Sequence, residues 1–221
     1  MAAQMTTRGG IGMTSERTRL RMIENLRREG IVDERVLTVM AEIPRHLFVD
    51  EGIASRAYED VALPIGHGQT ISSPSIVAHM TQLLLKKGAM GKVLEIGTGC
   101  GYQTAVLAKL VKEVYTLERI APLMDKARRH LRDLRFYNVR YKHADGHAGY
   151  PEGGPYDGIL MAASATHVPD ALKQQLAVGG RLVLPVGVED QWLYVIDRTE
   201  TGFTEQKCEP VRFVPLLPGL A

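Results

Sequence analysis

The sequence contains little cysteine and no long apolar run. Its 221 residues include two cysteines, Cys100 and Cys208, and neither belongs to a Cys-x-x-Cys or Cys/His pattern. A disulfide framework is therefore excluded, and a reducing compartment is favoured. No stretch approaches the roughly 20 apolar residues of a membrane span, and the first residues lack the apolar core of a signal peptide. We expect a cytoplasmic protein with no membrane partner.

The chain also lacks an excess of charge of either sign, with a formal net charge of +2 at pH 7. Basic residues between positions 126 and 135 alternate with apolar ones, a pattern typical of a solvated helix face. We therefore expect no nucleic-acid partner. The seven histidines are spread along the chain, and histidines in such positions are more often polar loop residues than ligands, so no metal site is expected.

Two common nucleotide-binding motifs are missing. There is no G-x-x-x-x-G-K-[ST] loop, and no G-x-G-x-x-G fingerprint accompanied by a Tyr-x-x-x-Lys pair. The sequence Met-Ala-Ala-Ser at 161–164 contains no Asp-Pro-Pro-Tyr-like group that would receive a nucleobase amine. These absences disfavour nucleoside-triphosphate chemistry, nicotinamide-dependent oxidation and methylation of nucleic-acid amines.

Residues 93–102, VLEIGTGCGY, join a buried-strand pattern to a glycine-dense turn and the start of a helix. The three glycines permit positive φ angles and a close approach of the backbone to a ligand. An acid two residues before the first glycine favours a cationic amino-acid group over a pyrophosphate. The pattern resembles the first motif of S-adenosylmethionine-dependent methyltransferases, and it predicts that this cofactor is bound by Glu95, Gly97, Thr98, Gly99 and Gly101.

The order of strand and helix patterns predicts an α/β fold with a doubly wound, mostly parallel, Rossmann-like sheet. Strands are expected at 93–96, 114–117, 139–141, 159–161 and 181–184, and helices at 102–110, 121–134 and 169–176. Closing strands are expected at 192–197 and 211–214. Each of these helices follows a buried strand, as in the cofactor half of wound sheets.

Upstream of this pattern, Ser15 and Asp33 are expected to cap two amphipathic helices that end at Gly30 and Pro44. They form an N-terminal helical layer. A further helix is expected at 74–85, with Ser73 as its cap. We expect residues 1–13 to be a disordered extension, with Met13 an alternative start, and 14–221 to be one domain. Residues 14–90 would form its helical and substrate-loop region, and 91–221 its cofactor-binding sheet and C-terminal strands.

Two more acids follow expected strands. Glu118 stands about 20 residues after the glycine turn, where wound sheets use a carboxylate to bind ribose hydroxyls. The alternative is a surface acid paired with Arg119. Asp145 and Gly146 follow the third strand, where the acid can contact an adenine amino group and the glycine leaves room for the ring. Taken alone, Asp-Gly is an ordinary turn signal.

Six groups of residues together resemble the protein-L-isoaspartate O-methyltransferase family: ALPIG at 62–66, QTISSP at 69–74, the glycine motif, DG at 145–146 with PYD at 155–157, GGRLVLPVG at 179–187 and VRFVPL at 211–216. The resemblance extends from about Ser15 to the last residue. The glycine motif alone indicates only a methyltransferase, whereas LPIG and QTIS combined with RFVPL are specific to this family.

The resemblance implies methyl transfer from S-adenosylmethionine to the α-carboxyl of L-isoaspartyl residues in damaged proteins and peptides, with S-adenosylhomocysteine as the other product. It implies that Ser72 is the active-site serine. It also implies that the peptide substrate is bordered by Thr70, Ile71, Ser73, Val211, Phe213 and Val214. Ser73 departs from the Gln or Ala that the family commonly has, and we expect it to act as a helix cap beside Ser72.

Two other functions remain compatible with the cofactor motif. The same cofactor half would serve a methyltransferase that acts on another carboxylate or on a hydroxyl. It would also serve a catalytically inactive cofactor-binding protein that works as an interaction module. Ser72 beside an intact glycine turn argues against the inactive protein, and acceptance of isoaspartyl peptides distinguishes the two methyltransferases.

Overall fold

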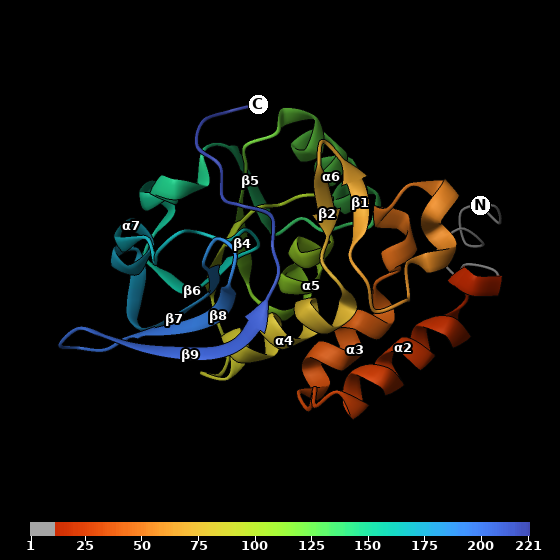
Figure 1. Ribbon diagram of the computed structural model, residues 1–221, viewed down its shortest axis with the longest axis horizontal. Helices are drawn as coiled ribbons and strands as arrows, with labels where there is room; N and C mark the ends of the chain where they lie inside the picture. The colour runs from red at the N-terminus through yellow and green to blue at the C-terminus, as the bar shows by residue number, and fades with distance from the viewer. Residues whose placement is uncertain (1–11) are drawn as a thin grey trace.

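A computed structural model describes residues 12–221, which form two β-sheets with helices around them (Figure 1). The larger sheet has seven strands in the order β5-β4-β3-β6-β7-β8-β9. They are β3 (Lys92–Ile96), β4 (Glu113–Glu118), β5 (Val139–His143), β6 (Tyr156–Met161), β7 (Leu176–Val186), β8 (Gln191–Arg198) and β9 (Phe203–Val211). The first five strands in this order are parallel, and β8 and β9 are antiparallel. The predicted mostly parallel, doubly wound sheet is confirmed.

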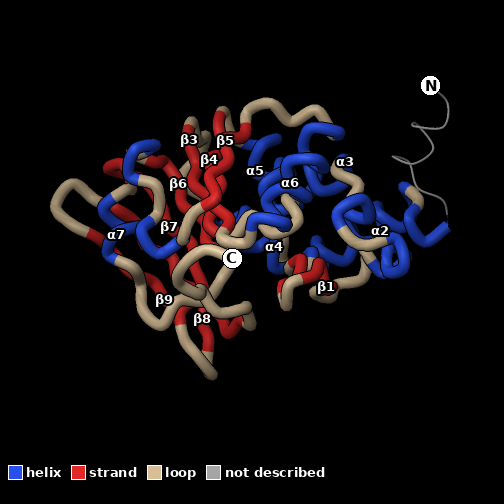
Figure 2. The backbone as a smooth tube through the Cα atoms, turned by 90° about the horizontal axis from the view of Figure 1, so that it is seen from above, coloured by secondary structure: helices blue, strands red, loops and turns tan. Residues whose placement is uncertain are grey.

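Helices cover both faces of this sheet. The α-helices are α2 (Glu16–Arg28), α3 (Glu34–Glu42), α4 (Pro74–Leu85), α5 (Tyr102–Leu110), α6 (Ala121–Asp133) and α7 (Asp170–Gln174). Short 3-10 helices are η1 (Gly12–Thr14), η2 (Arg45–Phe48), η3 (Glu51–Arg56), η4 (Gly146–Ala148) and η5 (Pro151–Gly153). Figure 2 shows α2 to α6 on one side of the sheet and α7 on the other. No helix within residues 12–221 is long and apolar enough to cross a membrane.

The alternation of side chains along buried strands creates a core on each face. Val93 of β3 packs in a cluster with α3, α4 and α5, whereas its neighbour Leu94 packs in the cluster that contains Leu172 of α7. This follows from the two-residue period of a strand, which sends successive side chains to opposite faces. Because both faces are covered, every residue of β3 after Lys92 is buried, including the polar Glu95.

The predicted helix caps are present. Ser15 and Asp33 accept hydrogen bonds from the main-chain N–H groups of Thr18 and Arg35, at 3.4 and 3.0 Å. Such caps satisfy N–H groups that have no partner inside the helix. The expected extension at 1–13 lies mostly outside the described residues, but Gly12 and Met13 belong to η1.

The prediction for the last strand is wrong at 212–214. The closing strand β9 instead ends at Val211, and it is a polar edge strand, exposed along much of its length, that pairs antiparallel with β8. The residues that follow run past the carboxyl end of β6, where Val214 O accepts from Ser164 N at 2.8 Å and Leu216 N donates to Ser164 O at 2.8 Å. This contact is an isolated parallel bridge between Ser164 and Pro215 and does not extend into a strand.

A small hairpin precedes α4. Strands β1 (Leu63–Gly66) and β2 (Gln69–Ile71) pair antiparallel, and the chain then passes through Ser72 into α4. Ser73 is the N-cap of α4, and Pro74 occupies its first turn. The hairpin thus delivers Ser72 to the N-terminal end of a helix that packs against the sheet.

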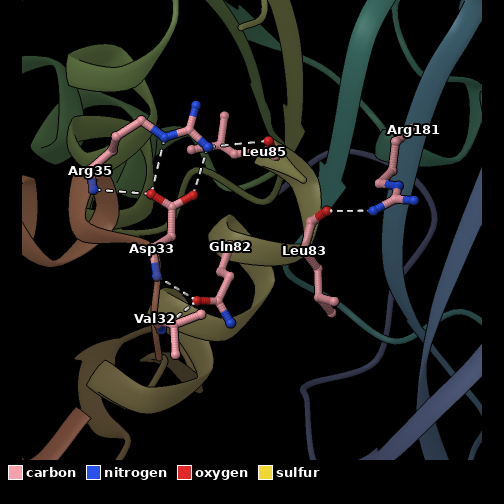
Figure 3. Close-up of polar contacts among 7 residues, drawn as sticks. All are labelled: Val32, Asp33, Arg35, Gln82, Leu83, Leu85 and Arg181. Carbon is pink, nitrogen blue, oxygen red and sulfur yellow. Dashed lines mark hydrogen bonds and ion pairs between the residues drawn. The ribbon is translucent and has the colours of Figure 1, made fainter. Parts of the chain in front are cut away.

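The C-terminal half of α4 is held by the helical layer (Figure 3). The Gln82 side-chain oxygen accepts from the main-chain N–H groups of Val32 and Asp33, at 2.7 and 2.9 Å. Arg35 Nη2 donates to the Leu85 carbonyl at 3.3 Å. The last carbonyls of a helix have no partner within it, so this contact also satisfies a free acceptor.

On its other side α4 is held by the sheet through Arg181 of β7. Arg181 Nη1 donates to the Leu83 carbonyl at 2.8 Å, as Figure 3 shows. The same guanidinium forms a two-pronged ion pair with Asp197 of β8, at 2.7 and 2.8 Å. These hydrogen bonds from Arg181, assisted by Lys87 at 3.2 Å, hold the pKa of the Asp197 carboxyl below its usual value. The pair therefore stabilises the folded state only while Asp197 is ionised.

We predict that Asp197→Asn lowers the free energy of unfolding by about 1.5 to 3 kcal/mol at pH 7, because charged hydrogen bonds are lost. Since the folded pKa is lowered, the contribution is complete above the unfolded pKa of about 4 and disappears as pH falls through the folded value. Urea denaturation between pH 7 and pH 3 measures this. Asp170→Asn, at an exposed aspartate, is the control and should change stability little. An equal loss at pH 7 and pH 3 would contradict the assignment.

Candidate active site

A cavity lies at the carboxyl ends of the parallel strands, where ligands bind in wound sheets. Its wall combines the ends of β3, β4 and β6 with the loop after β5, the loop before α4 and the C-terminal segment. Five of these six segments each contribute a residue that the sequence analysis predicted: Gly97, Glu118, Gly146, Ser72 and Phe213. Segments far apart in the sequence therefore form one site.

The glycine turn has the backbone conformation that the motif predicts. Gly97 and Gly99, which line the cavity, have φ angles of 94° and 54°, in the left-handed region that side chains disfavour. The N–H groups of Gly97 and Thr98 donate to Leu117 O at 2.9 and 3.1 Å, which fixes the turn against β4. Gly101 has a φ of 91° and begins α5, but it lies against Ala127 and Leu131 rather than in the cavity wall.

Glu118 connects the end of β4 to the glycine turn. Its carboxylate is 6% exposed, lines the cavity, and accepts from Gly99 N and from Ile120 N, each at 2.9 Å. Each carboxylate oxygen has a second lone pair, so acceptor capacity remains for a ligand. The alternative pairing with Arg119 is wrong, because that guanidinium donates to the carbonyls of Pro218 and Gly219.

Glu95 does not face the cavity, and the expectation of direct contact with the cofactor is corrected. It is fully buried, and its Oε2 accepts from Thr104 Oγ1 at 2.5 Å and from Thr116 Oγ1 at 2.6 Å. Burial raises its pKa to about 8. Thr98 is likewise buried behind the turn, hydrogen-bonded to Thr116 at 2.6 Å. Both residues therefore stabilise the turn through buried hydrogen bonds to Thr116 of β4.

Asp145 also binds protein rather than facing the cavity. Its Oδ1 accepts from His147 N at 2.9 Å and its Oδ2 from Gly219 N at 2.6 Å, so it attaches the C-terminal segment to the loop after β5. The neighbouring Gly146 does line the cavity, and a Cβ there would overlap with Ile96. The glycine is thus required by packing against Ile96, and its role in leaving room for an adenine ring stays a prediction, whereas the expected adenine contact of Asp145 is not supported by its position.

The loop before α4 supplies the predicted hydroxyls. Thr70, Ile71 and Ser72 line the cavity together with Phe213 and Val214. Two other residues expected at the substrate do not line it: Ser73 faces α4, where its Oγ accepts from Ile76 N at 3.5 Å, and Val211 ends β9. The predicted capping role of Ser73 is thus present in the structure.

Sequence reasoning missed several lining residues. They include Met80, Gln103, Ile120, Ala144 and Ala162. Ile120 lies two residues after Glu118, and Ala144 directly precedes Asp145. Their position next to predicted strand ends could therefore have identified them. Met80 and Gln103 lie within helices, and only packing decides which helix face meets the cavity.

No group of three or more His, Cys, Asp or Glu residues within 12–221 could hold a metal ion. His143 and His147 stand four residues apart, a spacing that binds metals on a helix. Here His143 ends β5, and its Nε2 lies 2.9 Å from Arg119 O. His147 lies in η4, and its Nδ1 is 2.8 Å from Asp145 Oδ1.

Comparisons with known proteins agree on one family. The family model of protein-L-isoaspartate(D-aspartate) O-methyltransferase matches residues 17–220. A protein-L-isoaspartate O-methyltransferase of Dechloromonas aromatica is 59% identical over 211 residues, which cover 95% of this chain and 98% of the relative. One of Chromobacterium violaceum is 54% identical over 220 residues, 99% of each chain.

Solved structures agree as well. A Plasmodium falciparum structure described as this enzyme, in complex with S-adenosyl-L-homocysteine, is 28% identical with a TM-score of 0.79 and covers 90% of this chain and 98% of its own. A second structure named protein-L-isoaspartate O-methyltransferase is 29% identical with a TM-score of 0.83, over 91% of this chain and 67% of its own. The family resemblance inferred from the motifs is confirmed.

We predict that Glu118→Ala weakens S-adenosylmethionine binding by about 10- to 150-fold, since charged hydrogen bonds worth about 1.5 to 3 kcal/mol are lost. The ribose is unchanged by methyl transfer, so the cofactor KM should rise more than kcat falls. Calorimetric titration and steady-state kinetics measure both. Glu113→Ala, at the partly exposed start of the same strand, should leave the affinity unchanged. A folded Glu118→Ala variant with wild-type affinity would remove Glu118 from the site.

Proposed function

The chain belongs to the protein-L-isoaspartate(D-aspartate) O-methyltransferase family, and we propose that its cavity brings S-adenosylmethionine together with the substrate carboxylate at Ser72. The reaction is transfer of a methyl group to the free α-carboxyl of L-isoaspartyl residues in damaged proteins and peptides. One observation carries the site assignment: Ser72, from the loop before α4, and Glu118, from the end of β4, line the same cavity.

The cavity residues fit the cofactor. Glu118 is buried beside the glycine turn, and each of its carboxylate oxygens accepts one main-chain N–H. The remaining lone pairs can accept hydrogen bonds from ribose hydroxyls. Gly146 packs directly against Ile96, and a Cβ there would overlap with it, so only a glycine fits where the loop after β5 meets the cavity wall. When bound, S-adenosylmethionine supplies a methyl group that is already activated by its sulfonium.

Positioning is then the main task of the protein. The substrate carboxylate is ionised at neutral pH, so no strong general base and no covalent intermediate are needed. We assign to the Ser72 hydroxyl a hydrogen bond that orients this carboxylate. Ser72 directly precedes the N-cap of α4, and the positive end of that helix dipole also favours an anion there. Holding both reactants in place supplies much of the acceleration.

The apolar part of the wall excludes water from the carboxylate. Ile71, Phe213, Val214 and Leu216 contribute to it. A less hydrated carboxylate interacts more strongly with the Ser72 hydroxyl and with the helix terminus. Methylation removes the negative charge and makes the carbonyl a better target for the neighbouring backbone nitrogen. That nitrogen can then displace methanol to form a succinimide, and hydrolysis by water reopens the ring partly to normal aspartate, which accounts for repair.

We also propose that residues 14–221 work as one methyltransferase domain. The N-terminal helices and the sheet share one apolar cluster, which includes Met40 of α3 and Val93 of β3. A cytoplasmic location and the lack of a nucleic-acid partner belong to the same proposal. The free thiols of Cys100 and Cys208 and the net charge of +2 support them.

We predict a preference for isoaspartyl over aspartyl peptides of identical sequence, by about 100-fold or more in kcat/KM. The isoaspartyl linkage adds a methylene to the main chain and leaves a free α-carboxylate, so a site that grips the backbone presents only one of the two carboxylates. Transfer of labelled methyl groups to paired peptides measures this. Similar rates for both peptides would indicate a general carboxyl methyltransferase instead.

We predict that Ser72→Ala binds cofactor normally but turns over about 10- to 150-fold more slowly, because it loses a hydrogen bond to a charged group worth about 1.5 to 3 kcal/mol. Ser73→Ala is the matched control. It should lose about 1 kcal/mol of stability as a missing cap and keep most of its activity. Kinetics and thermal denaturation of both variants separate the two roles, and the reverse pattern would show that the adjacent hydroxyls are assigned the wrong way round.

A further inference from the structure

Arg45 places a buried positive charge behind the loop that carries Ser72. Its side chain lies at the start of η2 and is 0% exposed. Arg45 Nε donates to the Ala57 carbonyl at 2.8 Å, and Nη2 donates to the Ser72 carbonyl at 2.7 Å. The guanidinium carbon lies 4.8 Å from the centroid of the Tyr102 ring, which lines the cavity. One side chain therefore touches both the Ser72 loop and the cavity wall.

This guanidinium has no ion-pair partner within the described part of the chain, residues 12–221, and its Nη1 has no hydrogen-bond partner there. Burial lowers its pKa. An unpaired buried charge is unfavourable for folding, and a neutral side chain of similar size would avoid that loss. Arg181, in contrast, is matched by the carboxylate of Asp197. Stability alone does not account for an arginine at position 45.

The two carbonyls that Arg45 binds stand on either side of the β1–β2 hairpin. Ala57 precedes the hairpin, and Ser72 follows it directly. The Ser72 carbonyl lies outside the hydrogen-bond ladder of α4, whose first acceptor is Ser73 O, bound by Val77 N at 3.1 Å. The planar fork of a guanidinium can span two acceptors in a fixed geometry, which the point charge of a lysine cannot. Arg45 thus joins the chain entering the hairpin to the chain leaving it.

We propose that Arg45 is a positioning residue for methyl transfer: its contacts with the Ala57 and Ser72 carbonyls hold the main chain so that the Ser72 hydroxyl faces the substrate carboxylate. This rests on the proposed role of Ser72. Arg45 touches neither reactant and acts through the orientation of Ser72. Its loss therefore affects turnover of the peptide more than binding of the cofactor.

The experiment compares Arg45→Lys with Arg19→Lys. Arg19 is a matched control, because it is also buried (7% exposed) and its Nε has no hydrogen-bond partner within residues 12–221. Like Arg45, it donates to a main-chain carbonyl, that of Glu42 at 3.0 Å. Its hydrogen bond does not involve the Ser72 loop. Arg45→Lys should lower kcat for an isoaspartyl peptide about 10-fold or more, with S-adenosylhomocysteine affinity within about 2-fold of wild type. Arg19→Lys should keep wild-type kcat.

Circular dichroism and thermal denaturation report whether each variant is folded, and calorimetry measures its cofactor affinity separately. If Arg45→Lys does not fold, Arg45→Gln is used in its place, because glutamine keeps an N–H donor and removes the unpaired buried charge. Slow turnover with intact S-adenosylhomocysteine binding supports the proposal. Wild-type kcat, or a parallel loss of cofactor affinity and kcat in the folded variant, would overturn it.

A double-mutant cycle with Ser72→Ala tests whether Arg45 acts through Ser72. If it does, the double variant should be about as slow as the slower single variant. Losses that multiply would mean that Arg45 acts independently, and the proposal would be abandoned. Wild-type turnover of Ser72→Ala would overturn the proposed role of Ser72 itself, whereas a slow Ser72→Ala with a normal Arg45→Lys would overturn only the role of Arg45.

Discussion

The Glu118 carboxylate joins the ends of two neighbouring strands, and the architecture of the cavity depends on this junction. It accepts from Gly99 N in the turn after β3 and from Ile120 N at the start of α6. Buried main-chain N–H groups need partners, and one side chain here satisfies two of them while facing the cavity. Behind the turn, Glu95 and Thr116 hold the same strands together through a buried hydrogen bond. Contacts within the protein therefore fix the glycine turn relative to β4 and α6.

The substrate half depends on a different element, the helix α4. Its C-terminal half is bound by the helical layer through Gln82 and by the sheet through Arg181, and its N-terminal end carries Ser72 and Ser73. Because α4 packs against β6 and β7, the position of the reactive loop is tied to the same sheet that forms the cofactor turn. Precise positioning, which the reaction requires in place of acid–base chemistry, follows from this double attachment.

Two of the three acids in these motifs, Glu95 and Asp145, bind other protein groups instead of lining the cavity. Glu95 stabilises the turn from a position that raises its pKa to about 8, and Asp145 attaches the C-terminal segment through Gly219 N. A carboxylate is a strong acceptor for N–H and hydroxyl groups, so an acid near a cofactor site often organises the loops around it. Proximity to a glycine motif therefore does not by itself mark an acid as a ligand contact.

Local sequence patterns determined much of this protein: the alternation of strands and helices, the caps at Ser15, Asp33 and Ser73, the glycine turn and the family. These features arise from contacts between residues close in the chain, and strand and helix periods record them. Tertiary structure alone decided that Glu118 faces the cavity while Glu95 does not, that the closing strand is Phe203–Val211, and that Arg45 binds the Ser72 carbonyl. Each of these depends on which segments, distant in sequence, pack together, and no local period encodes that choice.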